Sequence, residues 1–270
     1  MGFFQRLDEA VKKNHSLLCV GLDPDPTLMP PGVNILDFNK AIVDATAGLV
    51  CAYKPNLAFY EAGGARGWEV LKQTLDYIPK EIPVIADAKR GDIGNTAKAY
   101  AIAIFDELGA GAVTVSPYLG FDSVEPFLDY QDKGIFILCR TSNAGAADFQ
   151  SLDVMAGGKE MPLYQAVAQK ADAWNKSGNT GLVVGATYPE ELKILRQAHP
   201  GMLFLIPGVG AQGGDLRLAV SYGQNSAGAG IIINSSRQIL YASRGRDFAQ
   251  AAARAALQLR DEINLYRSTT

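Results

Sequence analysis

Eight short apolar runs constrain the fold of this chain more than any other feature of its sequence. Each run is almost wholly apolar, which is typical of a strand buried on both faces of a parallel sheet. The runs span residues 16–22, 49–53, 83–86, 112–115, 134–139, 181–184, 202–206 and 229–233. Stretches with the apolar spacing of helices lie between them. The clearest are residues 36–47, 68–78, 96–108 and 163–174, and an amphipathic segment at 247–265 follows the last run.

Eight strand–helix units in about 250 residues match a TIM (β/α)8 barrel. A doubly wound open sheet is the alternative, because strand order cannot be read from one sequence. The first run is followed by Gly21-Leu22-Asp23 instead of a glycine-rich dinucleotide fingerprint, which disfavours that alternative. No linker or shift in composition interrupts the chain, so we predict a single barrel domain over residues 1–270. Residues 142–162 form the longest irregular stretch, an elaborated loop whose role the sequence leaves open.

Charge and cysteine usage exclude several classes of protein. A net charge of -3 and a pI near 5.5 give no basic footprint for nucleic acid or an anionic membrane. No apolar stretch approaches the roughly 20 residues that span a bilayer, and the N-terminal sequence does not resemble a signal peptide. Cys19, Cys51 and Cys139 lie in apolar runs without metal-ligand spacing. We therefore expect buried thiols in a cytoplasmic protein.

The densest charge in the chain follows the third apolar run. If that run is a strand, Asp87 and Lys89 point to the same face. A carboxylate and an ammonium at the end of a buried strand are costly unless each has a partner. Asp92 follows on a glycine-containing turn. His15 and His199 stand beside no candidate nucleophile, so acid–base chemistry falls to lysine and aspartate.

Polar residues at the carboxyl ends of barrel strands form the active site of this fold. In chain order these ends supply Asp23, Lys54, Asp87 with Lys89, Ser116, Thr141 with Ser142, Thr187, residues 207–212 and residues 235–237. The glycine-rich loop after the seventh run and Arg237 after the eighth occupy the usual phosphate site of the fold. Alternatively, the glycines only permit tight turns and Arg237 pairs with a surface acid. The coincidence of both loops favours phosphate binding.

Each candidate also has a purely structural interpretation. Asp23 could be a turn residue in its Asp-Pro-Asp-Pro segment, and Lys54 an exposed lysine at a strand end. Asp92 could cap the helix that follows. Asp87 and Lys89 could form a structural ion pair, although four charges within six residues favour a functional cluster.

Residues 87–96 read Asp-Ala-Lys-Arg-Gly-Asp-Ile-Gly-Asn-Thr, which resembles the D-x-K-x-x-D-I-x-x-T signature of the orotidine 5′-monophosphate decarboxylase family. Further matches follow in order along the chain. They are Gly21-Leu22-Asp23, Lys54-Pro55-Asn56, residues 207–215 and Ser236-Arg237. The long loop and the Asn234-Ser235-Ser236-Arg237 ending are similar to the longer bacterial and archaeal-type subgroup.

The resemblance implies a homodimeric barrel that converts orotidine 5′-monophosphate to UMP and CO2 without a cofactor or metal. It implies a catalytic network of Lys54, Asp87, Lys89 and Asp92, with Asp92, Ile93 and Thr96 reaching into the partner's site. It also implies a nucleotide site made of Asp23 and Lys54 at the ribose, Ser142 at the pyrimidine edge, and Gln212 and Arg237 at the phosphate, with Pro207 and Ser236 beside them. One departure is Ser236, because shorter family members have glycine there.

Decarboxylation at C6 leaves a carbanion in the ring plane, so it requires positioned charge in a water-poor site. The Lys89 ammonium could stabilise that carbanion and then protonate it. Three other functions remain open. A metal-dependent sugar-phosphate decarboxylase or synthase shares the D-x-K-x-x-D motif, but Lys54 would repel its ion. A Schiff-base aldolase needs a neutral amine, which flanking aspartates oppose. A non-catalytic nucleotide-phosphate binder would gain nothing from Asp87 opposing a ligand carboxylate.

Overall fold

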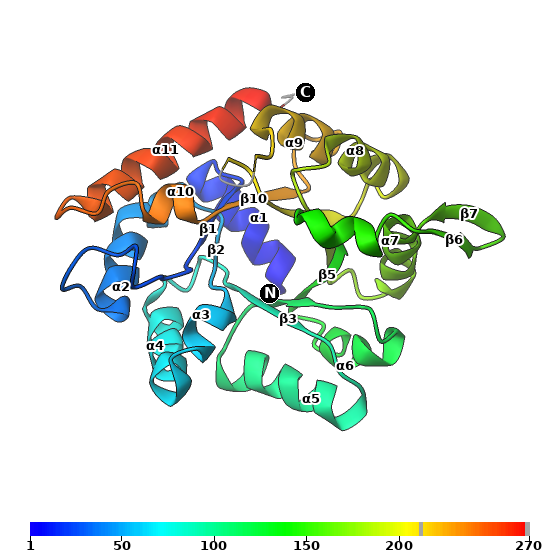
Figure 1. Cartoon of the computed structure of the whole chain (residues 1–270), viewed down its shortest axis with the longest axis horizontal. Coiled ribbons are helices and arrows are strands. Elements are labelled where there is room, and N and C mark those ends of the chain that lie inside the picture. Colours follow the sequence, from blue (N-terminus) through cyan, green and yellow to red (C-terminus); the bar gives the residue numbers. More distant parts are fainter. Residues whose placement is uncertain (211–212, 268–270) are drawn as a thin grey trace.

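The computed structural model describes residues 1–210 and 213–267, and it contains one eight-stranded parallel sheet surrounded by helices (Figure 1). The strands are β1 (Leu18–Gly21), β2 (Ala52–Lys54), β3 (Ile85–Arg90), β4 (Ala112–Val115), β5 (Gly134–Arg140), β8 (Thr180–Val184), β9 (Leu203–Pro207) and β10 (Ile231–Ser235). Their order in the sheet is β2-β1-β10-β9-β8-β5-β4-β3. All eight predicted apolar runs are therefore strands.

The two ends of this sheet meet and close it into a barrel. Isolated parallel bridges pair Tyr53 of β2 with Val84, and Asn56 with Asp87 of β3. The Tyr53 amide donates to the Pro83 carbonyl at 3.1 Å, and the Asp87 amide donates to the Pro55 carbonyl at 2.9 Å. The predicted TIM barrel is confirmed, and the open doubly wound sheet is excluded.

Helices cover the outside of the barrel. They are α1 (Phe3–Asn14), α2 (Ile35–Thr46), α3 (Leu57–Glu61), α4 (Gly64–Tyr77), α5 (Gly94–Ile102), α6 (Glu125–Leu128), α7 (Leu163–Trp174), α8 (Pro189–Ala198), α9 (Leu216–Gly223), α10 (Arg237–Leu240) and α11 (Phe248–Tyr266). A π-helical turn (Ala103–Glu107) continues α5, so the helix predicted at 96–108 exists but begins earlier. Among the residues described, no helix combines the length and apolar character needed to cross a membrane.

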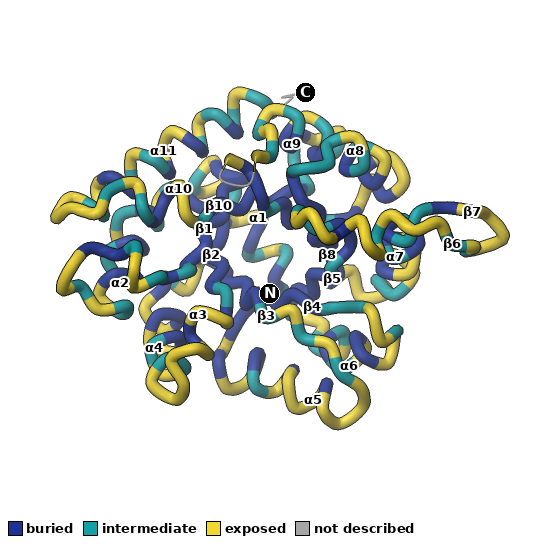
Figure 2. Tube along the Cα trace, viewed as in Figure 1, coloured by how far each residue is buried: buried dark blue, intermediate teal, exposed yellow. Residues whose placement is uncertain are grey.

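Two apolar layers stabilise the barrel, one inside it and one between the strands and the helices. The interior layer contains Cys19, Ala52, Ile85, Ala112, Phe136, Val183, Leu205 and Ile232. Helix α1 closes the N-terminal end, where the Phe3 ring meets the Phe136 ring edge-on with centroids 5.9 Å apart. Figure 2 shows this buried centre against the exposed outer faces of the helices. Burying a phenylalanine contributes about 1.5–3 kcal/mol, so the packed rings stabilise the closed N-terminal end of the barrel. The candidate site lies at the opposite end.

The irregular stretch 142–162 contains local structure of its own. The stretch holds a 3-10 turn (Ala144–Asp148) and an antiparallel hairpin of β6 (Asp153–Ala156) and β7 (Lys159–Pro162), which projects from the barrel (Figure 1). Gly157 and Gly158 both have positive φ at the hairpin turn, a conformation that glycine adopts without strain. Cys19, Cys51 and Cys139 are buried and free, as predicted.

Candidate active site at the carboxyl ends of the strands

A cavity of about 580 Å³ opens at the C-terminal end of the barrel. Apolar side chains of Val183 and Leu205 contribute to its lining, together with charged and polar groups from the loops around it. The structure brings eight of the predicted site residues to this cavity. They are Asp23, Lys54, Asp87, Lys89, Ser142, Pro207, Ser236 and Arg237. Gln212 lies outside the described residues.

Asp87 is the centre of a buried ionic network at one side of the cavity. Its Oδ2 accepts from Lys54 Nζ at 2.8 Å, and its Oδ1 accepts from Lys89 Nζ at 2.6 Å. Thr114 Oγ1 on β4 also donates to Oδ1, at 2.9 Å. Asp87 is 9% exposed and Lys54 only 4%, so Lys54 is no surface lysine. This carboxylate is the type of buried charge that requires partners, and it has three.

The network keeps both of its buried members charged. Burial raises the pKa of Asp87, but the nearby ammonium groups of Lys54 and Lys89 lower it by a larger amount. The pKa of Asp87 therefore lies below its ordinary range. For Lys54 the directions are opposite: burial lowers its pKa, and the carboxylates of Asp87 and Asp23 raise it by more. The pKa of Lys54 therefore lies above its ordinary value. Lys54 and Asp87 are therefore both charged at neutral pH, and the Asp87 carboxylate lies between the side chains of Lys54 and Lys89.

A local distortion of β3 carries Lys89 into the cavity. Lys89 has φ +47°, a left-handed conformation that costs a residue with a side chain roughly 1–2 kcal/mol. The ladder between β3 and β4 shifts register between Ala86 and Arg90. Thr114 Oγ1 accepts the Lys89 amide at 3.0 Å and fixes the bulge. Asp87 and Lys89 do share one side, as predicted, but through this bulge instead of regular alternation. The Lys89 side chain is 49% exposed, so a ligand can reach it.

Asp23 is fixed beside this network by contacts from distant parts of the chain. Its Oδ1 accepts from the Asn56 amide at 3.1 Å, and its carbonyl accepts from the Tyr241 hydroxyl at 2.8 Å. The same hydroxyl accepts from the Asp25 amide at 2.7 Å. Asp25, not Asp23, has the turn role, because its side chain accepts from the amide and hydroxyl of Thr27. The Asp23 carboxylate is thus presented to the cavity.

The loops after β9 and β10 form the other side of the cavity. Gly208 and Gly210 have φ +96° and +67°, so these turns require glycine. Arg237 begins α10 and lines the cavity, and it has no ion-pair partner among the described residues. Ser236 packs against Gly21, where an added Cβ would overlap the serine hydroxyl. A cation is therefore available at the predicted phosphate position.

The second half of the charged segment points elsewhere. Asp92, Ile93 and Thr96 do not line the cavity of their own chain. The Asp92 carboxylate accepts from the adjacent Ile93 amide at 2.8 Å, and α5 has no side-chain cap, so the capping role considered for Asp92 is not found. Ile93 is 54% exposed and Thr96 is exposed as well.

Sequence reasoning assigned no individual role to four residues that shape the cavity, although Asn56 and Asn234 lie in motifs named above. Thr114 gave no signal, because it lies within an apolar run. Asn56 and Tyr241 act on Asp23 through contacts that no local pattern predicts. Asn234 on β10 is buried at the cavity, and its side-chain oxygen has no hydrogen-bond partner among the described residues. A lone asparagine ending the run Ile231-Ile232-Ile233 was the available signal for it.

Comparisons with known proteins agree with this geometry. The sequence profile of the Orotidine 5'-phosphate decarboxylase / HUMPS family matches residues 16–254. The orotidine 5'-phosphate decarboxylase of Dehalococcoides mccartyi (strain CBDB1) is 60% identical over 267 residues, which cover 99% of both chains. That of Roseiflexus castenholzii is 54% identical over 270 residues, with 98% of both chains covered.

Solved structures give the same result. The OMP decarboxylase of Leishmania donovani superposes with a TM-score of 0.87 at 43% identity, covering 99% of both chains. A putative orotidine-monophosphate-decarboxylase from Toxoplasma gondii superposes with a TM-score of 0.90 at 39% identity, covering 98% of this chain and 96% of the other. The chain belongs to the orotidine 5′-phosphate decarboxylase / HUMPS family.

Proposed function

We propose that this protein decarboxylates orotidine 5′-phosphate to UMP and CO2, the last step of de novo UMP synthesis, in the cytoplasm and without a cofactor. The observation that carries the proposal is the arrangement of charge around one cavity. Lys54, Asp87 and Lys89 alternate in sign on one side, and Arg237 stands on the other. This arrangement complements a ligand with a phosphate at one end and a reacting carboxylate at the other. Relatives up to 61% identical carry the name of this activity.

The reaction breaks the bond between C6 and the carboxylate carbon, and the electron pair stays on C6. That carbanion lies in the ring plane and cannot delocalise into the π system, so fixed positive charge must stabilise it. Lys89 supplies the charge and then transfers a proton from Nζ to C6, which gives UMP. The neutral amine regains a proton from water before the next turnover.

Asp87 contributes in two ways. With Lys54 it holds the Lys89 ammonium in place, at 2.6 Å from Oδ1. Its carboxylate would also stand beside the carboxylate of the substrate, a like-charge contact that ends when CO2 departs. Two unit charges about 4 Å apart at an effective dielectric of about 20 interact by about 4 kcal/mol. This amount is smaller than a full enzymatic acceleration, so we assign more of the effect to carbanion stabilisation.

Substrate binding is divided around the cavity. We assign the ribose hydroxyls to Asp23 and Lys54, and the pyrimidine edge to Ser142. We assign the phosphate to Arg237 and Gln212, within the loops that include Pro207 and Ser236. The phosphate is remote from C6, so its binding energy serves to close loops over the reacting groups.

A second copy of the chain completes the site in this proposal. Asp92, Ile93 and Thr96 do not line the cavity of their own chain, and exposed apolar side chains lie on this loop and on the loop after β4. Tyr118 and Leu119 follow β4, which pairs with β3, and both are exposed together with Ile93. Exposed apolar side chains on the loops of two paired strands fit a subunit interface. In a homodimer Asp92 would join the network of the partner subunit.

The direct test is the ultraviolet spectrum after addition of orotidine 5′-phosphate in excess EDTA. We expect the orotate absorbance to be replaced by that of uracil at an unchanged rate under chelation. The physical reason is Lys54, whose ammonium lies 2.8 Å from Asp87 and would repel a divalent ion there. Loss of activity in EDTA with rescue by Mg²⁺ would favour the metal-dependent sugar-phosphate enzymes instead.

A further inference from the structure

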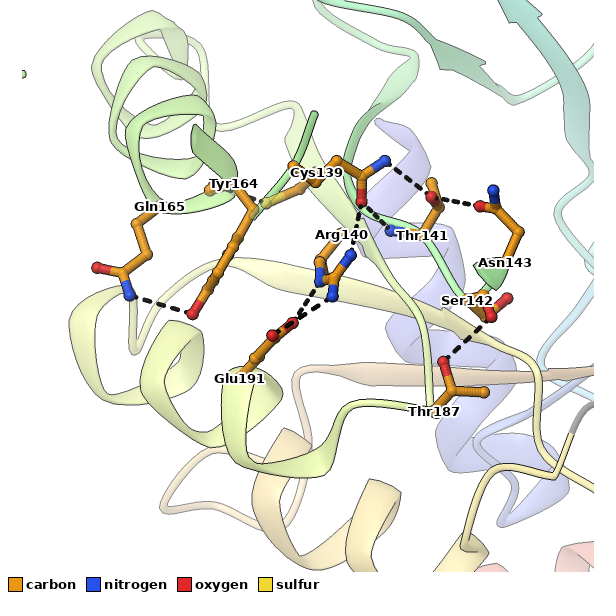
Figure 3. Close-up of polar contacts among 10 residues, drawn as sticks. Cys139, Arg140, Thr141, Ser142, Asn143, Tyr164, Gln165, Thr187 and Glu191 are labelled. Atoms are coloured by element: carbon orange, nitrogen blue, oxygen red, sulfur yellow. Dashed lines mark hydrogen bonds and ion pairs between the residues drawn. The ribbon is translucent and has the colours of Figure 1, made fainter. Parts of the chain in front are cut away.

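The base of the irregular stretch 142–162 holds a partly buried polar cluster around Arg140 and Gln150 that the proposed function leaves without a role (Figure 3). We propose that Gln150 is a positioning residue that fixes Ser142 and Asn143 at the cavity and so sets the affinity for the base of the nucleotide. The inference rests on the proposed function, because it assigns the base to this side of the cavity.

The side chain of Gln150 holds the turn that leaves β5. Its Oε1 accepts from the Thr141 amide at 2.8 Å, and its Nε2 donates to Thr141 Oγ1 at 2.8 Å. Thr141 Oγ1 in turn donates to Asn143 Oδ1 at 2.7 Å. Thr141, Ser142 and Asn143 all line the cavity. One amide group therefore fixes both the backbone and the side chain at the start of this three-residue wall.

Arg140, at the end of β5, contacts Gln150 and limits its movement. Its guanidinium is buried and forms an ion pair with Glu191 of α8 (Figure 3). It also stacks on the Tyr188 ring, 3.8 Å from the centroid. Arg140 Nη1 also donates to Gln150 Oε1 at 3.4 Å. A paired, buried guanidinium has little freedom to move. The Gln150 side chain is therefore anchored to the rigid barrel and not only to its own loop.

The opposite side of Ser142 is equally close-packed. Thr187 Oγ1 donates to the Ser142 carbonyl at 3.3 Å (Figure 3). A Cβ added at Gly185, which follows β8, would lie 2.8 Å from both the backbone nitrogen and the Cβ of Ser142. Gly185 does not have a positive φ, so an alanine there is a steric change without backbone strain. The Gly185→Ala variant would push Ser142 from its place.

The projecting hairpin of β6 and β7 takes no part in the contacts of Gln150 with Thr141 and Arg140. The Leu163 amide donates to the Leu152 carbonyl at 2.8 Å, and the Tyr164 amide donates to the Gln150 carbonyl at 3.0 Å. These bonds close the loop just beyond Gln150, and the exposed Met155 lies further out on β6. The positioning role therefore ends at Gln150.

The test compares two ligands that differ only in carrying a base. The dissociation constants of UMP and ribose 5-phosphate are measured by calorimetry for the parent protein, Gln150→Ala and Gly185→Ala. We expect each variant to bind UMP about tenfold more weakly, because a displaced Ser142 would lose one hydrogen bond to the base, and to bind ribose 5-phosphate as the parent does. The matched controls are Gly201→Ala, where an added Cβ meets nothing within 4 Å, and Met155→Ser. Neither control should change either constant.

Equal weakening of both ligands would overturn the proposal, because it would indicate general loosening of the cavity. An unchanged UMP constant in Gln150→Ala would overturn it as well, whatever the result for Gly185→Ala, which tests only the position of Ser142. If Gln150→Ala does not fold, Gln150→Glu, which keeps the Oε1 acceptor and loses the Nε2 donor to Thr141, takes its place. A selective loss of UMP binding in a protein that does not turn over orotidine 5′-phosphate would support the positioning role while rejecting the proposed function.

Discussion

The two halves of the segment after β3 differ in burial, in partners and in direction. Asp87 is buried and satisfied by three donors, one of them the Lys89 ammonium. Within residues 1–210 and 213–267, Asp92 accepts only from its neighbouring amide, and Ile93 exposes an apolar side chain to solvent. A buried charge must find partners within its own chain, whereas a partly exposed one need not. The first half is therefore satisfied within its own chain, and the second half is the part that the proposed dimer would place in the partner's site.

Two glycines make this change of direction possible. A Cβ at Gly91 would lie 3.1 Å from Ser116, so the backbone passes tightly against the loop after β4. Gly94 has φ +54° at the start of α5. Between them the chain leaves its own cavity, and Asp92 and Ile93 lie on this turn.

The largest effect should come from the first half. Lys89→Ala should lower the turnover of orotidine 5′-phosphate by roughly 10⁴-fold or more, since it removes both the stabilising charge and the proton donor. The fold should persist, because the Lys89 side chain is half exposed and Lys54 still satisfies Asp87. Ultraviolet assay and circular dichroism measure the two properties. A variant that turns over at the parental rate would reject the role of Lys89.

The two halves of the segment should also differ in how much their aspartates contribute to the free energy of unfolding. Asp87→Asn should lower the free energy of unfolding by roughly 3 kcal/mol at neutral pH, because it leaves the buried Lys54 without its counter-charge. The matched change Asp92→Asn should stay within about 0.5 kcal/mol of the parent. Urea titrations measure both. Similar losses in the two variants would remove the distinction between the halves.

The pH dependence of that difference follows from the direction of the pKa shift. The folded-state pKa of Asp87 lies below its ordinary value of 3.8, so the carboxylate stabilises the fold above that pH and the contribution is lost as the pH falls below it. The difference in free energy of unfolding between the parent and Asp87→Asn should therefore decrease progressively below about pH 4. A difference that increases there would contradict the stabilising role of the charged Asp87.

The smallest effect concerns the association of subunits. Ile93→Asp should weaken dimer formation by about tenfold or more, because a charge replaces an apolar side chain that would otherwise be buried. The barrel itself should unfold as the parent does. Met155→Asp on the hairpin, a more exposed apolar position, is the control and should leave association unchanged. Sedimentation velocity at several concentrations distinguishes the two variants.

Much of this fold could be predicted because strands buried on both faces leave a plain apolar signature. The eight runs, the barrel and the positions of Asp87, Lys89 and Arg237 follow from that signature and from the rule for barrel strand ends. The left-handed backbone of Lys89 could not be predicted, because alternation assumes a regular strand and Thr114 sets the bulge from a neighbouring one.

Contacts between distant positions limited the rest of the prediction. Tyr241 fixes Asp23 across 218 positions of sequence, and Glu191 pairs with Arg140 across 51. Residues 142–162 show neither helical nor alternating apolar spacing, so the hairpin and the Gln150 contacts had no local pattern to reveal them.

The division of the segment between two subunits is tested most directly by mixing two inactive variants. Lys89→Ala and Asp92→Ala subunits are combined, exchanged and assayed with orotidine 5′-phosphate. If Asp92 acts in the partner's site, each heterodimer holds one site with both residues intact, and random exchange should restore about a quarter of the parental activity. If heterodimers form, as shown by differently tagged subunits, and no activity returns, Asp92 serves its own chain and the account is wrong.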